Sequence, residues 1–293
     1  MLTISVKNYL LEQFQTGGVE MEKMMGGTTE GANFSLRDEI KAYWSARAAT
    51  FDEQPGHEIF SEEERQAWRR LFMRHLCTGD GRKALDLASG TGVVSHLLDG
   101  LGFAVTGMDW ADPMLALARA KASRNGRPIR FVMGDAENTM EPDETYDVIT
   151  NRHLVWTLVD PKAAFLEWHR VLKPGGKVLV VDGDFVNPGP VAELARKLAT
   201  LAARLGLARD KHHGATTSDM AATHQSILSR VYFSQGARAE AVADLLKQAG
   251  FETVVIDTDM RAIHKAQAKN FSFFKGLERA MQHRYAVVAT KAK

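Results

Sequence analysis

The fold is decided by the stretch Ala84-Leu85-Asp86-Leu87-Ala88-Ser89-Gly90-Thr91-Gly92. Its first five residues form a short apolar run, which is typical of a buried parallel strand. The glycines that follow predict a tight turn into a helix that begins near Val93. Glycines at such a turn let the backbone approach a ligand closely, and the helix N-terminus offers free N–H groups. The stretch therefore predicts a ligand site where a strand turns into a helix.

Further apolar runs follow at the spacing of βαβ units, separated by helix-length segments or turns. The predicted strands are Ala84–Ala88, Ala104–Met108, Ile129–Met133, Tyr146–Thr150, Lys177–Val181, Thr253–Asp257 and Tyr285–Thr290. Two helices are predicted to begin at Asp112-Pro113 and Asp160-Pro161, each with an N-cap carboxylate before the proline. We therefore expect an α/β fold with a seven-stranded, mostly parallel sheet, its last strand antiparallel, and helices on both faces.

Segments outside this alternation complete the predicted organisation. Residues 1–34, of which 15–33 are rich in Gly, Thr and Met, are expected to form a flexible N-terminal arm, and 35–293 to form the α/β domain. Within that domain, 35–80 is expected to be a helical cap, in which Ser61 and Glu64 form a capping-box pattern. The segment 187–235 is too long for a simple connection, which predicts a helical lid or substrate insert after the fifth strand.

Composition narrows the class of protein. The 293 residues carry a formal net charge of +1, without the clustered basic excess that nucleic-acid or membrane partners usually require. No apolar stretch approaches 18 residues, and the start lacks a signal-peptide cleavage site. Cys77 is the single cysteine, which excludes an intrachain disulfide and a zinc site built from several thiolates. We expect a cytoplasmic enzyme with a small-molecule ligand and no metal. A homodimer is a possible assembly.

Three acids stand at the ends of successive predicted strands. Asp86 precedes the glycine turn, where a carboxylate would repel a pyrophosphate but suits an ammonium group. Asp109 can accept both ribose hydroxyls of an adenosine. Asp135 can accept from the exocyclic amine of adenine, with the Ala136 backbone beside it. Each acid alone could instead cap a helix or end a loop in solvent, but the three in order predict a site for S-adenosylmethionine (SAM).

With Val171-Leu172-Lys173-Pro174-Gly175-Gly176 before the fifth strand, these stretches resemble the class I (Rossmann-like) SAM-dependent methyltransferases that act on small molecules. The resemblance covers roughly Tyr43 to Asp182. The family usually has glycine at the position of Ala88, where a methyl group fits if φ stays negative. Residues 43–52 resemble an N-terminal segment that closes over SAM, and an amphipathic helix packed on the domain is the alternative. The cofactor-binding residues that we expect are Tyr43, Arg47, Asp86, Ala88, Gly90, Gly92, Asp109, Trp110, Met114, Asp135, Ala136 and Asn151.

The acceptor is expected beyond the carboxyl ends of the fourth and fifth strands, the ligand-binding edge of an open α/β sheet. There His153 is the candidate general base, because its side chain titrates near neutrality, and a structural histidine is the alternative. Asp184 is the second catalytic candidate, as the receptor for an acceptor ammonium; a solvated loop acid is the alternative.

Four further residues are candidate substrate contacts. Arg152 can clamp a carboxylate through two hydrogen bonds, or pair with a nearby acid. Trp156 can shield a sulfonium by a cation–π contact, or pack in the core. The insert contributes His224 and Tyr232.

The predicted function is methyl transfer from SAM to a small molecule by in-line displacement, which requires alignment and exclusion of water. The acceptor atom is left open between N, O and S; a thioether or amino-acid acceptor is attractive because Arg152 and Asp184 could hold a zwitterion. An NAD(P)-dependent oxidoreductase is an alternative, against which Ser95 stands where that fingerprint has its third glycine. A non-catalytic SAM-binding protein is another.

Overall fold

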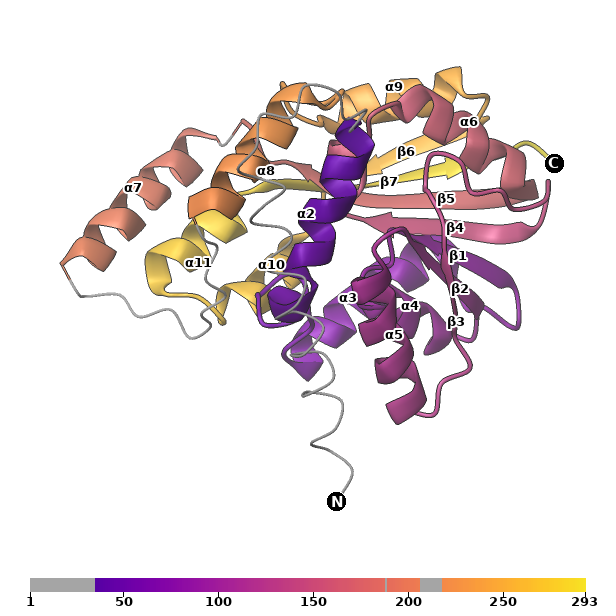
Figure 1. Ribbon diagram of the computed structural model, residues 1–293, viewed down its shortest axis with the longest axis horizontal. Helices are drawn as coiled ribbons and strands as arrows, with labels where there is room; N and C mark the ends of the chain where they lie inside the picture. Colours follow the sequence, from indigo (N-terminus) through magenta and orange to yellow (C-terminus); the bar gives the residue numbers. More distant parts are fainter. Residues whose placement is uncertain (1–34, 188, 206–217) are drawn as a thin grey trace. The chain divides into compact units, whose positions relative to one another are not determined.

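A seven-stranded sheet forms the centre of the chain, in the order β3-β2-β1-β4-β5-β7-β6 (Figure 1). The computed structural model describes residues 35–187, 189–205 and 218–293. The strands are β1 Lys83–Leu87, β2 Ala104–Asp109, β3 Arg130–Met133, β4 Tyr146–Arg152, β5 Leu172–Asp184, β6 Thr253–Asp257 and β7 His283–Thr290. Strands β1 to β5 pair in parallel, and β7 runs antiparallel to both β5 and β6. The predicted fold class is confirmed.

Strand β5 is much longer than the predicted run 177–181. It begins at Leu172, which pairs with Tyr146 of β4, and ends at Asp184, which pairs with His283 of β7. Neighbouring strands on both sides therefore extend the ladder beyond the apolar run that the sequence marks. The extension matters because it carries the chain to the edge of the sheet where the site lies.

Helices surround the sheet, and their ends follow local capping chemistry. The helices are α2 Leu36–Phe51, α3 Glu62–Leu76, α4 Val93–Asp99, α5 Asp112–Arg124, the 3₁₀ turn η1 Val155–Thr157, α6 Pro161–Val171, α7 Pro190–Arg204, α8 Ser218–Arg230, α9 Ala239–Gln248, α10 Arg261–Ala268 and α11 Phe273–Ala280. Ser61 and Asp160 cap α3 and α6 as predicted, each accepting a hydrogen bond from a backbone N–H three residues on. The predicted N-cap at Asp112 is wrong: Ala111 is the N-cap of α5, because the Asp109 carboxylate binds the Ala111 N–H and fixes the chain one residue earlier.

Two apolar layers enclose the sheet. Helices α6 and α9 cover one face, where Phe165, Trp168 and Leu246 are buried against β4, β5 and β7. Helices α3, α4 and α10 cover the other face, where Trp68 and Phe72 are buried. Burial of side chains of this size contributes about 1.5–3 kcal/mol each. The helices on both faces hold the carboxyl ends of the strands in fixed register.

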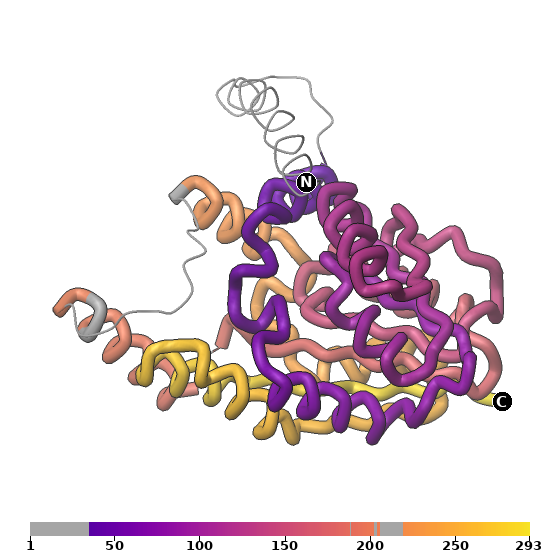
Figure 2. Tube along the Cα trace, turned by 90° about the horizontal axis from the view of Figure 1, so that it is seen from below, coloured from indigo at the N-terminus to yellow at the C-terminus, as the bar shows by residue number. Residues whose placement is uncertain are grey.

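The predicted cap and insert supply the remaining helices. Residues Leu36–Lys293 form one compact unit; the expectation of a flexible arm at 1–34 falls outside the described residues, as does 206–217 of the insert. Helix α2 packs on α8 through Ile40, Tyr43, Ile227 and Val231. Helices α7 and α11 lie side by side (Figure 2). The cap and the insert therefore meet over the sheet edge.

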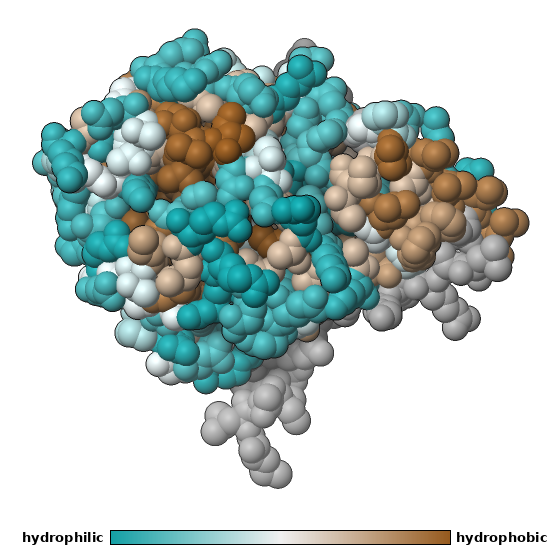
Figure 3. Space-filling model, turned by 180° about the vertical axis from the view of Figure 1, so that it is seen from behind, coloured by the Kyte–Doolittle hydropathy of each residue, from teal (hydrophilic) through white to brown (hydrophobic). Residues whose placement is uncertain are grey.

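Helix α7 leaves apolar side chains exposed, which Figure 3 shows in brown on that part of the surface. Leu194, Leu201 and Leu205 are more than half exposed, as is Phe273 of the neighbouring α11. In the described part of the chain, no helix has the length and apolar character that crossing a membrane requires.

Candidate functional site

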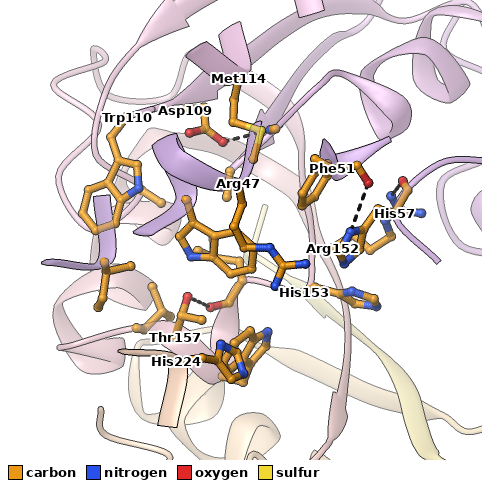
Figure 4. Close-up of a pocket in the computed structure, with 18 of the residues that line it drawn as sticks. Arg47, Phe51, His57, Asp109, Trp110, Met114, Arg152, His153, Thr157 and His224 are labelled. Carbon is orange, nitrogen blue, oxygen red and sulfur yellow. Dashed lines mark hydrogen bonds between the residues drawn. The ribbon is translucent and has the colours of Figure 1, made fainter. Parts of the chain in front are cut away.

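A cavity of about 340 Å³ lies at the carboxyl edge of the sheet (Figure 4). Its volume falls in the range typical of small-molecule sites. Helices α2, α8 and α11 and the turns after β1 to β5 line it. We call the wall formed by Asp109, Trp110 and Met114 the β2 side, and the wall formed by His57, Arg152 and His153 the β4 side.

The glycine turn brings backbone to the cavity. Gly90 has φ +53° and lines the cavity, and a Cβ there would meet only the Phe51 ring, at 3.6 Å. Ala88 also lines it, with φ +50°, whereas the sequence favoured a negative φ. A left-handed alanine costs roughly 1–2 kcal/mol, so the turn stores strain where a ligand would approach.

Asp109 is the central acid of the β2 side. One carboxylate oxygen accepts from the Gly90 N–H at 2.9 Å, and the other from the Ala111 N–H at 2.8 Å. The side chain is buried, and burial raises the pKa of the carboxyl. Because each carboxylate oxygen has two lone-pair sites, each still has one site free for a ligand hydroxyl.

Asp135, Ala136 and Glu137 continue this wall after β3. Asp135 is not free: Arg37 of α2 donates to it at 2.6 Å and also pairs with Glu137. Glu137 in turn accepts from the Val159 N–H at 2.7 Å. The sequence did not predict this ion-pair network, which ties the cap helix α2 to the wall.

Asp86 lies in a second, smaller cavity of about 40 Å³. This cavity shares Ala88, Gly90 and Arg152 with the larger one. Ser95 donates to one oxygen of Asp86 at 2.5 Å, and burial raises the pKa of Asp86 to about 7. The three acids predicted at successive strand ends are thus gathered around two adjoining cavities.

His153 lies on the β4 side in a left-handed conformation, with φ +61°. Its ring makes no hydrogen bond to any residue within the described ranges, and it meets the Phe185 ring edge-on at 5.5 Å. Burial, reinforced by the positive charges of Arg284 and Arg152, holds the pKa of His153 well below its usual range. The imidazole is therefore neutral at physiological pH.

Arg152 occupies the boundary between the two cavities. One of its terminal nitrogens donates to the His57 carbonyl at 2.5 Å, and the guanidinium lies 5.3 Å from the centre of the Trp68 ring. Its other terminal nitrogen, Nη1, is buried without a hydrogen-bond partner among the described residues. One face of this cation is thus available to a ligand.

Aromatic side chains form a further part of the cavity lining. The Trp156 ring lies 6.3 Å from Trp44, 6.2 Å from Phe185 and 5.5 Å from His224. Arg47 also lines the cavity, and its guanidinium lies 5.7 Å from the Trp44 ring. Its hydrogen bonds go to the Tyr43 hydroxyl and the Gln54 amide.

Besides Asp86, which lines the smaller cavity, five candidates from the sequence do not line the larger one: Tyr43, Gly92, Asn151, Asp184 and Tyr232. Asp184 accepts from the N–H groups of Val186 and Asn187, and so orders the turn that carries Phe185. Asn151 is buried with both amide atoms unpartnered among the residues described. Tyr232 is about half exposed.

Other residues that line the cavity were missed by the sequence analysis, among them Phe51, Gln54, His57, Glu137 and Arg279. Gln54 and His57 flank the Pro55-Gly56 turn between α2 and α3, and a Pro-Gly pair after the cap segment is a signal that could have marked that loop. Arg279 lies on α11, and nothing in its local sequence distinguishes it from a surface arginine.

Fold and site together define a Rossmann-like protein with a cavity of small-molecule size at the carboxyl edge of its sheet. A family model described as "Methyltransferase domain" matches residues 85–180. The demethylmenaquinone methyltransferase of Renibacterium salmoninarum is 31% identical over 52% of this chain and 62% of its own length, and that of Thermus thermophilus is 37% identical over 39% and 53%. The chain thus spans little more than half the length of these relatives.

Another relative is matched over more of its length. The ubiquinone/menaquinone biosynthesis C-methyltransferase UbiE of Shewanella woodyi is 31% identical over 54% of this chain and 68% of its own length. Phosphoethanolamine N-methyltransferase 2 of Haemonchus contortus, solved with SAM, shares the fold, with a TM-score of 0.56 and 16% identity over 92% of this chain and 61% of that one. The chain belongs to the class I SAM-dependent methyltransferases, as the resemblance predicted.

Proposed function

We propose that this protein transfers the methyl group of SAM to a small-molecule acceptor bound in the larger cavity. The observation that supports this most is the continuity of that cavity. It joins the acid Asp109 on the β2 side to His153 and Arg152 on the β4 side, at the ligand-binding edge of the sheet. One nucleoside and one acceptor can therefore be held within reach of each other.

The β2 side fits SAM. Asp109 would hold the ribose hydroxyls, because its free lone pairs face the cavity wall beside Trp110 and Met114. Gly90 offers backbone without a side chain, and Asp135 with Ala136 would meet the adenine. The remaining proposed cofactor contacts that line the cavity are Arg47 and Ala88. Tyr43, Gly92 and Asn151 do not line it and would act by supporting the residues that do, as the Tyr43 hydroxyl does by accepting from Arg47.

Asp86 would hold the ammonium of the methionyl part. Gly90 and Arg152 also line the small cavity. Burial raises the pKa of Asp86 to about 7. A bound ammonium group would lower that pKa again, because a nearby positive charge favours the carboxylate over the protonated acid.

When bound, SAM supplies an electrophilic methyl group on a sulfonium. The residues of this chain then have three tasks: to orient the acceptor, to exclude water, and to hold any proton that the acceptor loses. Trp156 would shield the sulfonium by a cation–π contact, with His224 packed on it. His153, neutral and without a hydrogen bond to the rest of the described chain, would accept a hydrogen bond or a proton from the acceptor.

The atom that receives the methyl group depends on which acceptor binds. Nitrogen, oxygen and sulfur remain candidates, and the relatives named as C-methyltransferases add carbon. Asp184 and Tyr232 would act by shaping the turns beside the cavity, because neither lines it.

We also propose the cytoplasm as the compartment, a small molecule and not a nucleic acid or a membrane as the partner, and a homodimer as the assembly. A net charge of +1 and a single cysteine support the first two. The exposed apolar side chains of α7 and α11 support the third. Light scattering after size exclusion gives the mass directly, and a monomer at all concentrations would overturn the dimer.

Turnover of methyl-labelled SAM with pooled metabolites tests the function. Label should pass to one or a few compounds, with S-adenosylhomocysteine (SAH) as the other product. Binding of NAD(P) in place of SAH would favour the oxidoreductase, and tight SAH binding without labelled product from any pool would favour a non-catalytic role.

A further inference from the structure

Three arginines converge behind the β4 side of the cavity. Arg152 from the end of β4 and Arg279 from α11 line it, and Arg284 from the beginning of β7 is buried, with 5% of its surface exposed. A Cβ added at Gly56 would collide with Nη2 of Arg279 and lie 3.7 Å from Nη2 of Arg284. The tips of these two guanidinium groups therefore meet beside one glycine.

The hydrogen bonds that these arginines do make go to neutral groups. Arg279 donates to the Pro55 carbonyl and Arg284 to the Gln267 amide, as Arg152 donates to the carbonyl of His57. Four of their nitrogens are buried without a partner among the described residues: Nη1 of Arg152, Nε of Arg279, and Nε and Nη2 of Arg284.

The nearest acids are already engaged. Glu64 accepts from Gln267 at 2.8 Å and from Trp68 at 3.3 Å. Asp182 accepts from the Val155 N–H at 2.7 Å and the Gly183 N–H at 2.9 Å. These two acids, like Glu58, Asp52 and Asp86 around Arg152 and Glu278 beside Arg279, act on the arginines only through space. Among the described residues, the positive charges of the cluster therefore have no carboxylate as a hydrogen-bonded partner.

Such a cluster is unfavourable unless an anion completes it. Buried charges are normally paired, and like charges held together repel. Burial and the neighbouring Arg279 and Arg152 hold the pKa of Arg284 well below its usual range. A guanidinium fork matches the two oxygens of a carboxylate or phosphate.

We propose that the acceptor carries a carboxylate or phosphate group, and that Arg152 and Arg279 bind it while Arg284 supports the charge from behind. This deepens the proposed function and rests on it. The cofactor's own carboxylate is a poorer occupant, because Arg279 lines only the larger cavity, whereas Asp86 and Gly90 share the smaller one with Arg152. The aromatic wall at Trp156 and Phe185 would receive the uncharged part of the acceptor.

The test compares Arg279→Met with wild type in the presence of saturating SAH, with inorganic phosphate as the probe and sodium chloride keeping the ionic strength constant. The thermal midpoint of wild type should rise with phosphate. The variant should need at least about tenfold more phosphate for the same rise. Without phosphate it should be as stable as wild type or more stable, because an uncompensated cation has been removed.

The matched control is Arg261→Met. Arg261 is an exposed arginine at the start of the neighbouring helix α10, and it pairs with Asp259. This control should respond to phosphate as wild type does. If Arg279→Met does not fold, Arg279→Lys keeps the charge and loses the fork, and an intermediate phosphate response is expected.

Equal phosphate responses in wild type and folded Arg279 variants would overturn the proposal. Calorimetry with SAH alone separates the sources of the anion: if Arg279→Met weakens SAH as much as phosphate, the cofactor carboxylate occupies the cluster and the proposal fails. If wild type does not bind SAH, the proposed function itself is contradicted.

Labelled product from the metabolite pool should carry an acidic group when it is identified by mass spectrometry. Its loss after phosphatase treatment of the pool would assign a phosphate, and its survival a carboxylate. A product with neither a carboxylate nor a phosphate would overturn the proposal.

Discussion

The two sides of the cavity differ in how far their polar side chains are hydrogen-bonded within the protein. On the β2 side, each oxygen of Asp109 is held by a backbone N–H of the turns that follow β1 and β2. On the β4 side, His153 makes no hydrogen bond to the residues described, and Arg152 has one buried nitrogen in the same condition. The carboxylate of the β2 side is thus hydrogen-bonded within the protein before a ligand binds, whereas polar atoms of the β4 side have no such partner among the described residues.

The difference indicates how the two walls would be used. A satisfied acid held by backbone is preorganised, so it can bind the same nucleoside in every cycle at little cost in ordering. Unpartnered groups gain most when a ligand satisfies them, and they penalise a ligand that cannot, which favours specificity. The β2 side would therefore set affinity for the cofactor, and the β4 side would select the acceptor.

The largest effect is expected from His153→Ala, on the β4 side. Turnover should fall about 100-fold, because the acceptor loses the group that receives its proton or hydrogen bond, while SAH affinity stays unchanged. Because the pKa of His153 lies well below its usual range, the wild-type rate should not fall between pH 8 and about 6.5 through protonation of this ring. His153→Asn is the control for the left-handed backbone. Undiminished turnover in His153→Ala would leave the ring structural.

On the β2 side, Asp109→Ala should weaken SAH by at least roughly tenfold, because a buried acceptor is lost and two backbone N–H groups lose their partner. Titration calorimetry measures this. Asp112→Ala, which removes an exposed acid three residues away, should bind SAH as wild type does. Unchanged affinity in Asp109→Ala would remove this residue from the ribose role and erase the contrast between the walls.

The smallest expected effect is the contribution of His57 to the pH dependence of stability. Burial and the charges of Arg47 and Arg152 lower its pKa to about 3 in the folded state. Since the unfolded chain binds a proton below about pH 6.5 and the folded chain does not, wild-type stability should fall as pH drops from about 6.5 towards 3. Between pH 7 and pH 6, His57→Gln should lose about 0.7 kcal/mol less than wild type in urea unfolding. Parallel losses would show that His57 carries no such penalty.

Sequence patterns located the sheet because buried parallel strands are short apolar runs, and each of the seven runs overlaps a strand of the structure, with Ala88 and Ile129 just outside β1 and β3. They also placed Asp86, Asp109 and Asp135, since a turn after each parallel strand leads to the same edge. Strand ends were less predictable: β5 owes its extra residues to pairing with β4 and β7.

Residues that reach the cavity from distant segments were harder to predict. Arg279 lines the cavity from α11, which packs against α7 and α10, and no local pattern encodes that packing. The bond between Arg37 and Asp135 likewise joins residues 98 positions apart. Asp184 was predicted from its place after β5, but the turn that it caps points its carboxylate to backbone N–H groups.

The distribution of tryptophans has a practical consequence. Of the five in the chain, Trp44, Trp110 and Trp156 line the cavity, while Trp68 and Trp168 are sealed in the two apolar layers. Intrinsic fluorescence is therefore a built-in optical reporter, in which ligand entry changes the emission of three indoles against a constant background from two. Substituting each of the three in turn would show whether a compound enters beside Trp110 or beside Trp156.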